Sequence, residues 1–116
     1  MADARVIQVE IVGKDQKALQ RYYSELFGWA FDTSAPGGYG MTDPATTGVT
    51  IGVGATRDGS AGHVTGYVTV TDIEATLARV SSLGGSVIMP KFSPIAGVQL
   101  ALIADPEGHI LGLTEV

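Results

Sequence analysis

Residues 105–115 read Asp-Pro-Glu-Gly-His-Ile-Leu-Gly-Leu-Thr-Glu and follow an apolar segment at residues 98–104. Pro106 presets its own φ angle, and Gly108 can adopt a positive φ without steric cost. The two segments therefore predict a β-hairpin, in which a four-residue turn joins strands at residues 98–104 and 109–115. Working outward from this hairpin, the same order of elements is found twice along the chain.

The half of the chain that contains the hairpin begins after a polar, flexible segment at residues 55–62, which we interpret as a linker. A strand is predicted at residues 63–71, and Asp72 is a typical N-cap for a helix at about 73–83. Gly84-Gly85 predicts the end of this helix. A short strand at residues 86–89 then precedes the hairpin.

The first half has a similar order. Residues 5–12 alternate, so that Ile7, Val9 and Ile11 share one face, which we expect to be buried. Asp15 predicts the start of a helix at about 15–27, and Gly28 predicts its end. Further strands are expected at residues 29–31, 39–41 and 47–53.

The chain therefore predicts an α+β fold of two βαβββ modules within one domain, residues 1–116. Module 1 covers residues 5–54, the linker 55–62, and module 2 residues 63–116. A module of roughly 55 residues is too small for a robust core alone. The two modules must therefore pair, either within one chain or between chains.

Composition excludes several classes of protein. The formal net charge is −5, and the seven Lys and Arg residues are scattered, which argues against nucleic acid and anionic membranes as partners. No segment approaches the ~20 apolar residues that span a bilayer, and residues 1–6 lack the pattern of a signal peptide. The absence of cysteine excludes disulfides and thiolate chemistry. We expect a cytoplasmic protein.

Four segments carry a resemblance to a known family: residues 19–29 (Leu-Gln-Arg-Tyr-Tyr-Ser-Glu-Leu-Phe-Gly-Trp), residues 67–72 (Tyr-Val-Thr-Val-Thr-Asp), Gly84-Gly85, and the Asp-Pro-Glu-Gly turn at 105–108. With the order of elements, they resemble the vicinal oxygen chelate superfamily. This group includes glyoxalase I, bleomycin-resistance proteins and extradiol dioxygenases. The resemblance implies that both modules form a curved mixed β-sheet around a cleft, with helices on its outer face. It also implies a homodimer.

The superfamily is named for a metal that is held by one residue on each of four cleft strands, typically His, Glu or Gln. By resemblance, these positions fall on Gln8, Thr65 and Gly112, and near Thr50. Only Gln8 could serve, and a single amide oxygen is a weak ligand. We therefore expect no metal and no other cofactor at these positions. A different metal site, built from Gln8, Glu10 and His63, is a less favoured alternative.

Two residues are candidates for proton transfer. Glu10 shares the polar face of its strand with Gln8, and it is either a ligand anchor or base, or a carboxylate bonded for structural reasons. His63 shares a strand face with Thr65 and Tyr67, where it could contact a ligand. His109, after the turn, is interpreted as a polar residue at the rim.

Larger apolar side chains supply the remaining candidates. By resemblance, Phe31, Tyr39, Met41 and Phe92 border the cleft, where they would suit a flat, largely apolar ligand. They could equally complete the core or a subunit contact. The residues expected to bind a ligand are Gln8, Glu10, Phe31, Tyr39, Met41, Thr50, His63, Thr65, Tyr67, Phe92 and Gly112.

The favoured function is that of a small-molecule binding protein of the glyoxalase and bleomycin-resistance type. It would bind or sequester an apolar or aromatic metabolite or antibiotic in a metal-free cleft. The alternative is a metal-independent isomerase, cyclase or lyase that uses Glu10 or His63. A metal-dependent lyase or dioxygenase is less favoured, because the ligand positions argue against it.

Overall fold

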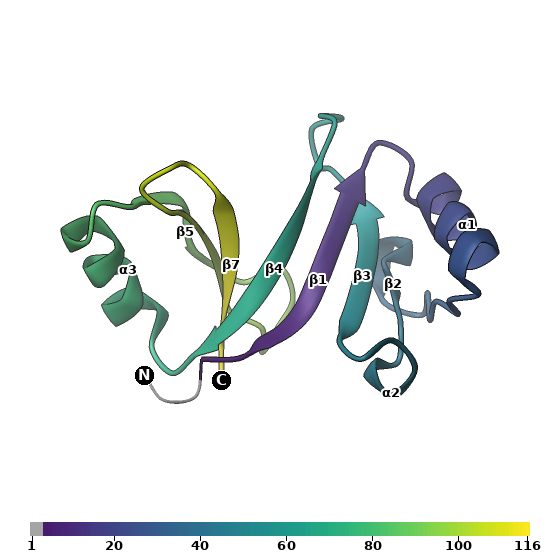
Figure 1. Cartoon of the computed structure of the whole chain (residues 1–116), viewed down its shortest axis with the longest axis horizontal. Coiled ribbons are helices and arrows are strands. Elements are labelled where there is room, and N and C mark those ends of the chain that lie inside the picture. The colour runs from purple at the N-terminus through teal and green to yellow at the C-terminus, as the bar shows by residue number, and fades with distance from the viewer. Residues whose placement is uncertain (1–3) are drawn as a thin grey trace. The chain divides into compact units, whose positions relative to one another are not determined.

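The computed structural model describes residues 4–116, which divide into two compact units. The first unit is Gln8–Thr65, and the second is Gly66–Val116 together with residues 4–7. These residues contain seven strands, three α-helices and one 3₁₀ turn (Figure 1), so the predicted α+β class is confirmed. The prediction that no signal peptide is present rests partly on residues 1–3, which lie outside the described residues.

The first unit is built around a parallel pair of strands. In this pair, Gln8 lies opposite Thr50, and Glu10 lies opposite Gly52. A short strand runs antiparallel to the second member of the pair. The strands are β1 (Val6–Gly13), β2 (Gly40–Met41) and β3 (Thr50–Ala55), and the connecting segments include α1 (Gln16–Phe27), a 3₁₀ turn (Pro36–Gly38) and α2 (Pro44–Thr47).

The second unit repeats this pattern with a longer ladder. Its first and last strands run parallel, with Tyr67 opposite Gly112, and the remaining pairs are antiparallel. The order within the unit is β4-β7-β6-β5. Its elements are β4 (His63–Val70), α3 (Ile73–Ser82), β5 (Ser86–Phe92), β6 (Leu100–Ala104) and β7 (Ile110–Glu115). The hairpin predicted around the Asp-Pro-Glu-Gly turn is confirmed as β6 and β7.

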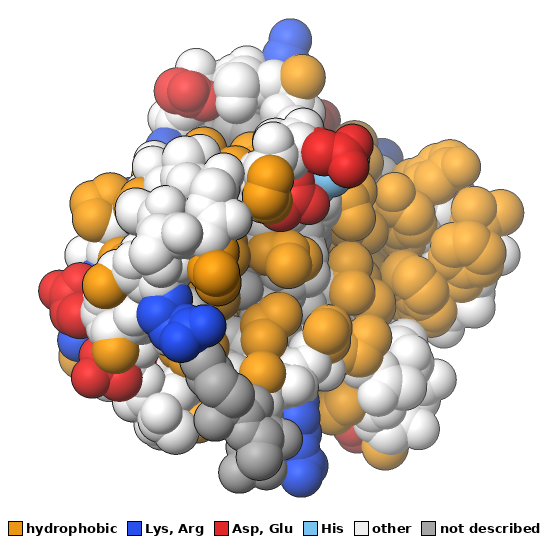
Figure 2. Space-filling view, turned by 60° about the vertical axis from the view of Figure 1, so that its left-hand side comes forward, with side chains coloured by type: hydrophobic (Ala, Val, Ile, Leu, Met, Phe, Trp, Pro, Cys, Tyr) orange, Lys and Arg blue, Asp and Glu red, His pale blue; other side chains and the backbone are white. Residues whose placement is uncertain are grey.

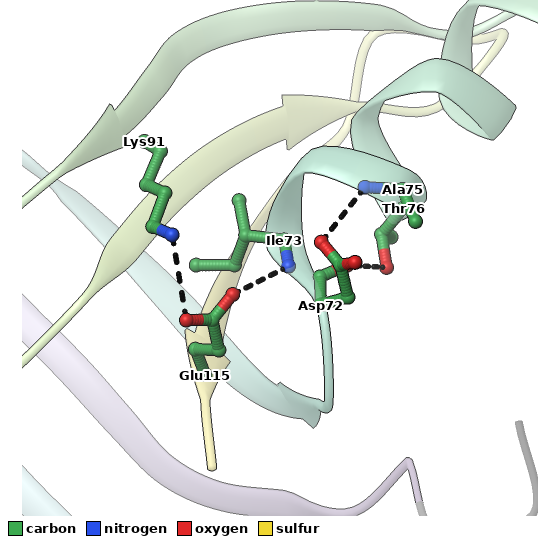
Figure 3. A network of polar contacts seen from close by, with 6 residues as sticks. All are labelled: Asp72, Ile73, Ala75, Thr76, Lys91 and Glu115. Atoms are coloured by element: carbon green, nitrogen blue, oxygen red, sulfur yellow. Dashed lines mark hydrogen bonds and ion pairs between the residues drawn. The ribbon is translucent and has the colours of Figure 1, made fainter.

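Helix α3 packs against β6 and β7, and their side chains form the hydrophobic core of the second unit. Ile73 is completely buried, and it clusters with Leu77, Ala101 and Leu113. Two carboxylates bind the N-terminus of α3 (Figure 3). The Asp72 carboxylate accepts from the Ala75 N–H, and the Glu115 carboxylate accepts from the Ile73 N–H at 2.8 Å. The Glu115 carboxylate also pairs with Lys91 at 3.4 Å.

Both long helices were predicted correctly, because their caps are encoded locally. Asp15 and Asp72 each accept a hydrogen bond from a backbone N–H in the first turn, and Gly28 has a φ of 75°. None of the helices in residues 4–116 is long and apolar enough to cross a membrane.

In the first unit, one predicted strand is absent and another begins later than predicted. Residues 29–31 form no strand, and only Asp32 makes an isolated bridge, with Met41. The strand expected at 47–53 starts at Thr50, because residues Pro44–Thr47 form a helical turn. Asp43 caps this turn and Gly48 ends it, with a φ of 85°.

Several large apolar side chains of the first module are exposed. Ile7, which was expected to be buried, is 44% exposed, and Tyr22, Leu26 and Phe27 of α1 are each more than half exposed. The aromatic side chains of this region pack against each other, with the ring centroids of Trp29 and Phe27 4.9 Å apart. Figure 2 shows further hydrophobic side chains gathered in patches at the surface.

Candidate functional site

One face of the first unit carries the polar residues that the sequence predicted. Paired residues of adjacent strands point to the same side of a sheet, so Gln8 and Glu10 share a face with Thr50 and Gly52. The opposite face meets α1, since a Cβ placed on Gly13 would lie 2.7 Å from the Leu19 side chain. The polar face is therefore turned away from the helix.

Tyr39 joins Gln8 and Glu10 into one hydrogen-bonded group. The Gln8 amide donates to the Tyr39 hydroxyl at 2.7 Å, and this hydroxyl donates to the Glu10 carboxylate at 3.0 Å. All three side chains are partly buried. A bond to an ionised carboxylate is among the stronger hydrogen bonds in proteins, so the group fixes the position of the phenol.

The phenol ring rests on two glycines of β3. A Cβ on Gly52 would overlap the Tyr39 hydroxyl, and a Cβ on Gly54 would lie 2.5 Å from the Tyr39 ring. Any other residue at these positions would therefore displace the ring. We call Gly52 and Gly54 the glycine shelf.

The loop that carries Tyr39 is held by α1. The Gln16 amide donates to the Gly37 carbonyl at 2.6 Å, and the Gln20 amide donates to the Gly38 carbonyl at 3.1 Å. Gly37 and Gly38 both have φ values of 78°, a conformation that favours glycine. The backbone next to Tyr39 is thus fixed independently of the Tyr39 side chain.

A shallow pocket of about 240 Å³ lies in the same unit, lined by Asp32, Met41, Thr42, Asp43 and Thr50. Two of these residues share the polar face, because Thr50 pairs with Gln8, and Met41 pairs with Gly52. Hydrogen bonds from the Ser34 hydroxyl and backbone N–H lower the pKa of Asp32, so its carboxylate is charged at neutral pH. Phe31 lies elsewhere, next to Trp29 on the side of β2 that faces Gln20.

His63 and Thr65, at the end of the first unit, contact each other. The His63 Nδ1 atom lies 2.7 Å from the Thr65 hydroxyl. Thr65 is only 1% exposed. His63 also lines a second, open pocket with Ile11, Leu19 and Tyr22. Its role toward a ligand stays a prediction.

In the second unit, a tyrosine again rests on a glycine. A Cβ on Gly112 would overlap the ring of Tyr67, which is only 6% exposed. Phe92 lies at the end of β5, opposite Leu100. That these residues share a cleft with the first unit stays a prediction.

The residues at the four metal positions do not fit a metal ion. Gln8 offers an amide that already bonds Tyr39, Thr50 and Thr65 offer neutral hydroxyls, and Gly112 offers no side chain. Throughout residues 4–116, no group of three or more His, Asp or Glu side chains is arranged to hold a metal ion. We therefore assign no step to a metal.

Sequence reasoning missed the joint contact of Tyr39 with Gln8 and Glu10, and it missed the glycine shelf. The alternate glycines of Thr-Ile-Gly-Val-Gly-Ala at residues 50–55 were the available signal, because alternate strand residues share a face. Glycines at such positions allow close approach of another group. What the sequence does not contain is the identity of that group.

Residues 8–114 match the model of the glyoxalase-like domain. The chain belongs to this family. The glyoxalase-like domain is 32% identical over 112 residues to a protein of Mycobacterium bovis and Mycobacterium tuberculosis that is named "Putative glyoxylase CFP32". That match covers 90% of this chain but only 43% of the length of those relatives.

Solved structures share the fold of the glyoxalase-like domain. A glyoxalase/bleomycin resistance protein/dioxygenase superfamily member from Vibrio splendidus aligns with a TM-score of 0.65 and 20% identity, over 97% of this chain and 99% of that one. Methylmalonyl-CoA epimerase from Mycobacterium tuberculosis aligns with a TM-score of 0.63 and 15% identity, over 95% and 86%. The fold implied by the sequence resemblance is confirmed.

Proposed function

We propose that this domain binds a small apolar or aromatic molecule without a metal, at the polar face of its first unit. The observation that carries the proposal is the hydrogen-bonded group of Gln8, Tyr39 and Glu10 on the glycine shelf. Small-molecule sites combine a mostly apolar surface with a few fixed polar groups that orient the ligand. The adjacent Met41 side chain, 36% exposed, supplies adaptable apolar surface.

Membership of the glyoxalase-like family supports the general class of protein in this proposal, and the side chains of the polar face support the choice of ligand. The amide of Gln8 is a donor and the carboxylate of Glu10 is an acceptor, so the two select a ligand that presents an acceptor and a donor close together. The four metal positions lack a suitable set of donors, which supports binding without a metal.

The test is a thermal-shift screen of aromatic and apolar compounds, run with and without a chelator. We expect the same ligands to stabilise the protein in both conditions. Glu10→Ala should weaken the binding of a confirmed ligand by about 10- to 100-fold, the range for a lost buried polar contact. Glu25→Ala, on the exposed surface of α1, is the matched control and should leave the affinity unchanged. Loss of binding with chelator would refute metal-free binding.

A second candidate function is metal-independent proton transfer, as in an isomerase, cyclase or lyase. The observation that favours it is the direct hydrogen bond from the Tyr39 hydroxyl to the Glu10 carboxylate, which pairs an acid with a base. The fold is shared with an epimerase, and the curated relatives are named as a glyoxylase.

Turnover of the ligands found in the screen separates the two functions. If Glu10 is a base, Glu10→Gln should abolish turnover and retain binding, since the amide keeps an acceptor oxygen but cannot take a proton. Conversion of none of these ligands by the wild-type protein would contradict proton transfer as the role of Glu10 toward them.

A further inference from the structure

We propose that the Tyr39 side chain is an internal occupant of the ligand site, and that a neutral phenol-like ligand displaces it. This inference rests on the proposed function and adds the class of ligand. The site would hold a flat ring on the glycine shelf, with a hydroxyl group between Gln8 and Glu10.

The hydrogen bonds of Tyr39 to Gln8 and Glu10 and its contact with the glycine shelf are ones that a free phenol could reproduce. The ring lies flat enough on the shelf that a Cβ on Gly52 or Gly54 would collide with it. The hydroxyl accepts from the Gln8 amide and donates to the Glu10 carboxylate. A phenolic ligand offers the same ring and the same pair of hydrogen bonds.

The Tyr39 side chain can leave without disturbing the backbone around it. The carbonyls of Gly37 and Gly38 are held by Gln16 and Gln20, and these bonds do not involve the tyrosine ring. Tyr39 is also partly exposed, so its side chain is not fully enclosed by the protein. Tyr67 is the contrasting case, because it rests on a glycine but is only 6% exposed.

Charge further restricts the ligand. The Glu10 carboxylate occupies the accepting end of the site. A ligand carboxylate at the position of the hydroxyl would meet a like charge at hydrogen-bond distance, which is unfavourable. The site therefore favours a phenol over a benzoate.

The experiment removes the internal occupant and supplies it from solution. Tyr39→Ala deletes the equivalent of one phenol molecule, so phenol should stabilise this variant and bind it at least tenfold more tightly than it binds the wild type. Benzene, which lacks the hydroxyl, should bind the variant about tenfold or more weakly than phenol does. Benzoate should also bind more weakly.

Leu83→Ala is the control. It deletes a large apolar side chain at an exposed position after α3, so phenol should stabilise it no more than it stabilises the wild type. Equal effects of phenol on both variants, or equal binding of phenol and benzene to Tyr39→Ala, would overturn the inference.

A measurement on the intact chain keeps the inference testable if Tyr39→Ala does not fold. With 3-fluorotyrosine incorporated, the ¹⁹F resonance of Tyr39, assigned with Tyr39→Phe, should move to a solvent-exposed position as phenol saturates. A resonance that does not move at saturation would overturn displacement. If the wild type binds other compounds in the screen and phenol fails both tests, this inference is wrong and the proposed function still stands.

Discussion

Gly52 has a hydrogen atom where other residues have a Cβ, and this leaves space for the Tyr39 hydroxyl. Gly52→Ala should therefore expel the tyrosine, because the new methyl group would overlap the hydroxyl and lie 2.6 Å from the Gln8 amide. Overpacking of this kind destabilises proteins by about 1–3 kcal/mol. Urea unfolding of the variant measures the change in the free energy of unfolding.

The control for this substitution is Gly66→Ala in β4. A Cβ there meets only Leu111 at 3.8 Å and Val6 at 4.0 Å, which are ordinary contacts. Replacement of such a glycine restricts the unfolded chain, so the variant should be as stable as the wild type or slightly more stable. Equal destabilisation by both substitutions would contradict the role assigned to the glycine shelf.

A second residue-scale prediction concerns Asp105 in the turn of the hairpin. A hydrogen bond from the His109 backbone N–H is the largest cause that lowers its pKa below the ordinary value of 3.8, and bonds from the His109 ring and the Glu107 N–H add to it. A carboxyl group whose pKa is lower in the folded state stabilises the fold above its unfolded pKa and loses this effect as the pH falls. Asp105→Ala should therefore reduce the loss of stability on acidification below about pH 4.

Urea unfolding at several pH values between neutral and acidic conditions checks this prediction. The wild type and Asp105→Ala should differ most at neutral pH and converge in acid. A difference that stays constant across the series would show that the ionised carboxylate of Asp105 does not matter to the fold.

At the scale of elements, the N-terminus of α3 depends on two carboxylates from different parts of the chain. Asp72 caps it locally, and Glu115 of β7 accepts from the Ile73 N–H. Asp72→Ala and Glu115→Ala should each cost about 0.5–2 kcal/mol, the range for the loss of an N-cap. Lys91→Met should cost less, since its partly exposed ion pair with Glu115 contributes about 0–1 kcal/mol.

Thermal unfolding followed by circular dichroism ranks these three variants. If Lys91→Met is the most destabilising, then the ion pair rather than the helix cap is the important role of Glu115. The comparison therefore distinguishes two interactions made by the same carboxylate.

The elements that sequence reasoning predicted well are those encoded by neighbouring residues. Asp15 and Asp72 mark helix starts through bonds within one turn, and the Asp-Pro-Glu-Gly turn sets its own hairpin. The strand predicted at residues 29–31 does not form, because a strand needs a neighbouring strand to bond with. In this segment only Asp32 forms a bridge, with Met41. Likewise, strand alternation placed Gln8 and Glu10 on one face, but their shared contact with Tyr39 joins residues about thirty positions apart, which no local pattern contains.

At the scale of the whole molecule, the amount of exposed apolar surface predicts association. Tyr22, Leu26 and Phe27 are each more than half exposed, which is unusual for large side chains on one helix of a monomer. We expect a homodimer, which sedimentation velocity at micromolar concentrations should detect. A single species with the mass of one 12.0 kDa chain would contradict this expectation.

The parallel pairing of β4 with β7 also bears on synthesis in the cell. β7 is the last strand in the sequence, yet it lies between β4 and β6 rather than at an edge. Ile110–Glu115 must therefore be synthesised before the second unit can close its ladder, and until then β4 and β6 each expose an unpaired edge. A second unit that still lacks β7 therefore carries two strand edges that other chains could pair with.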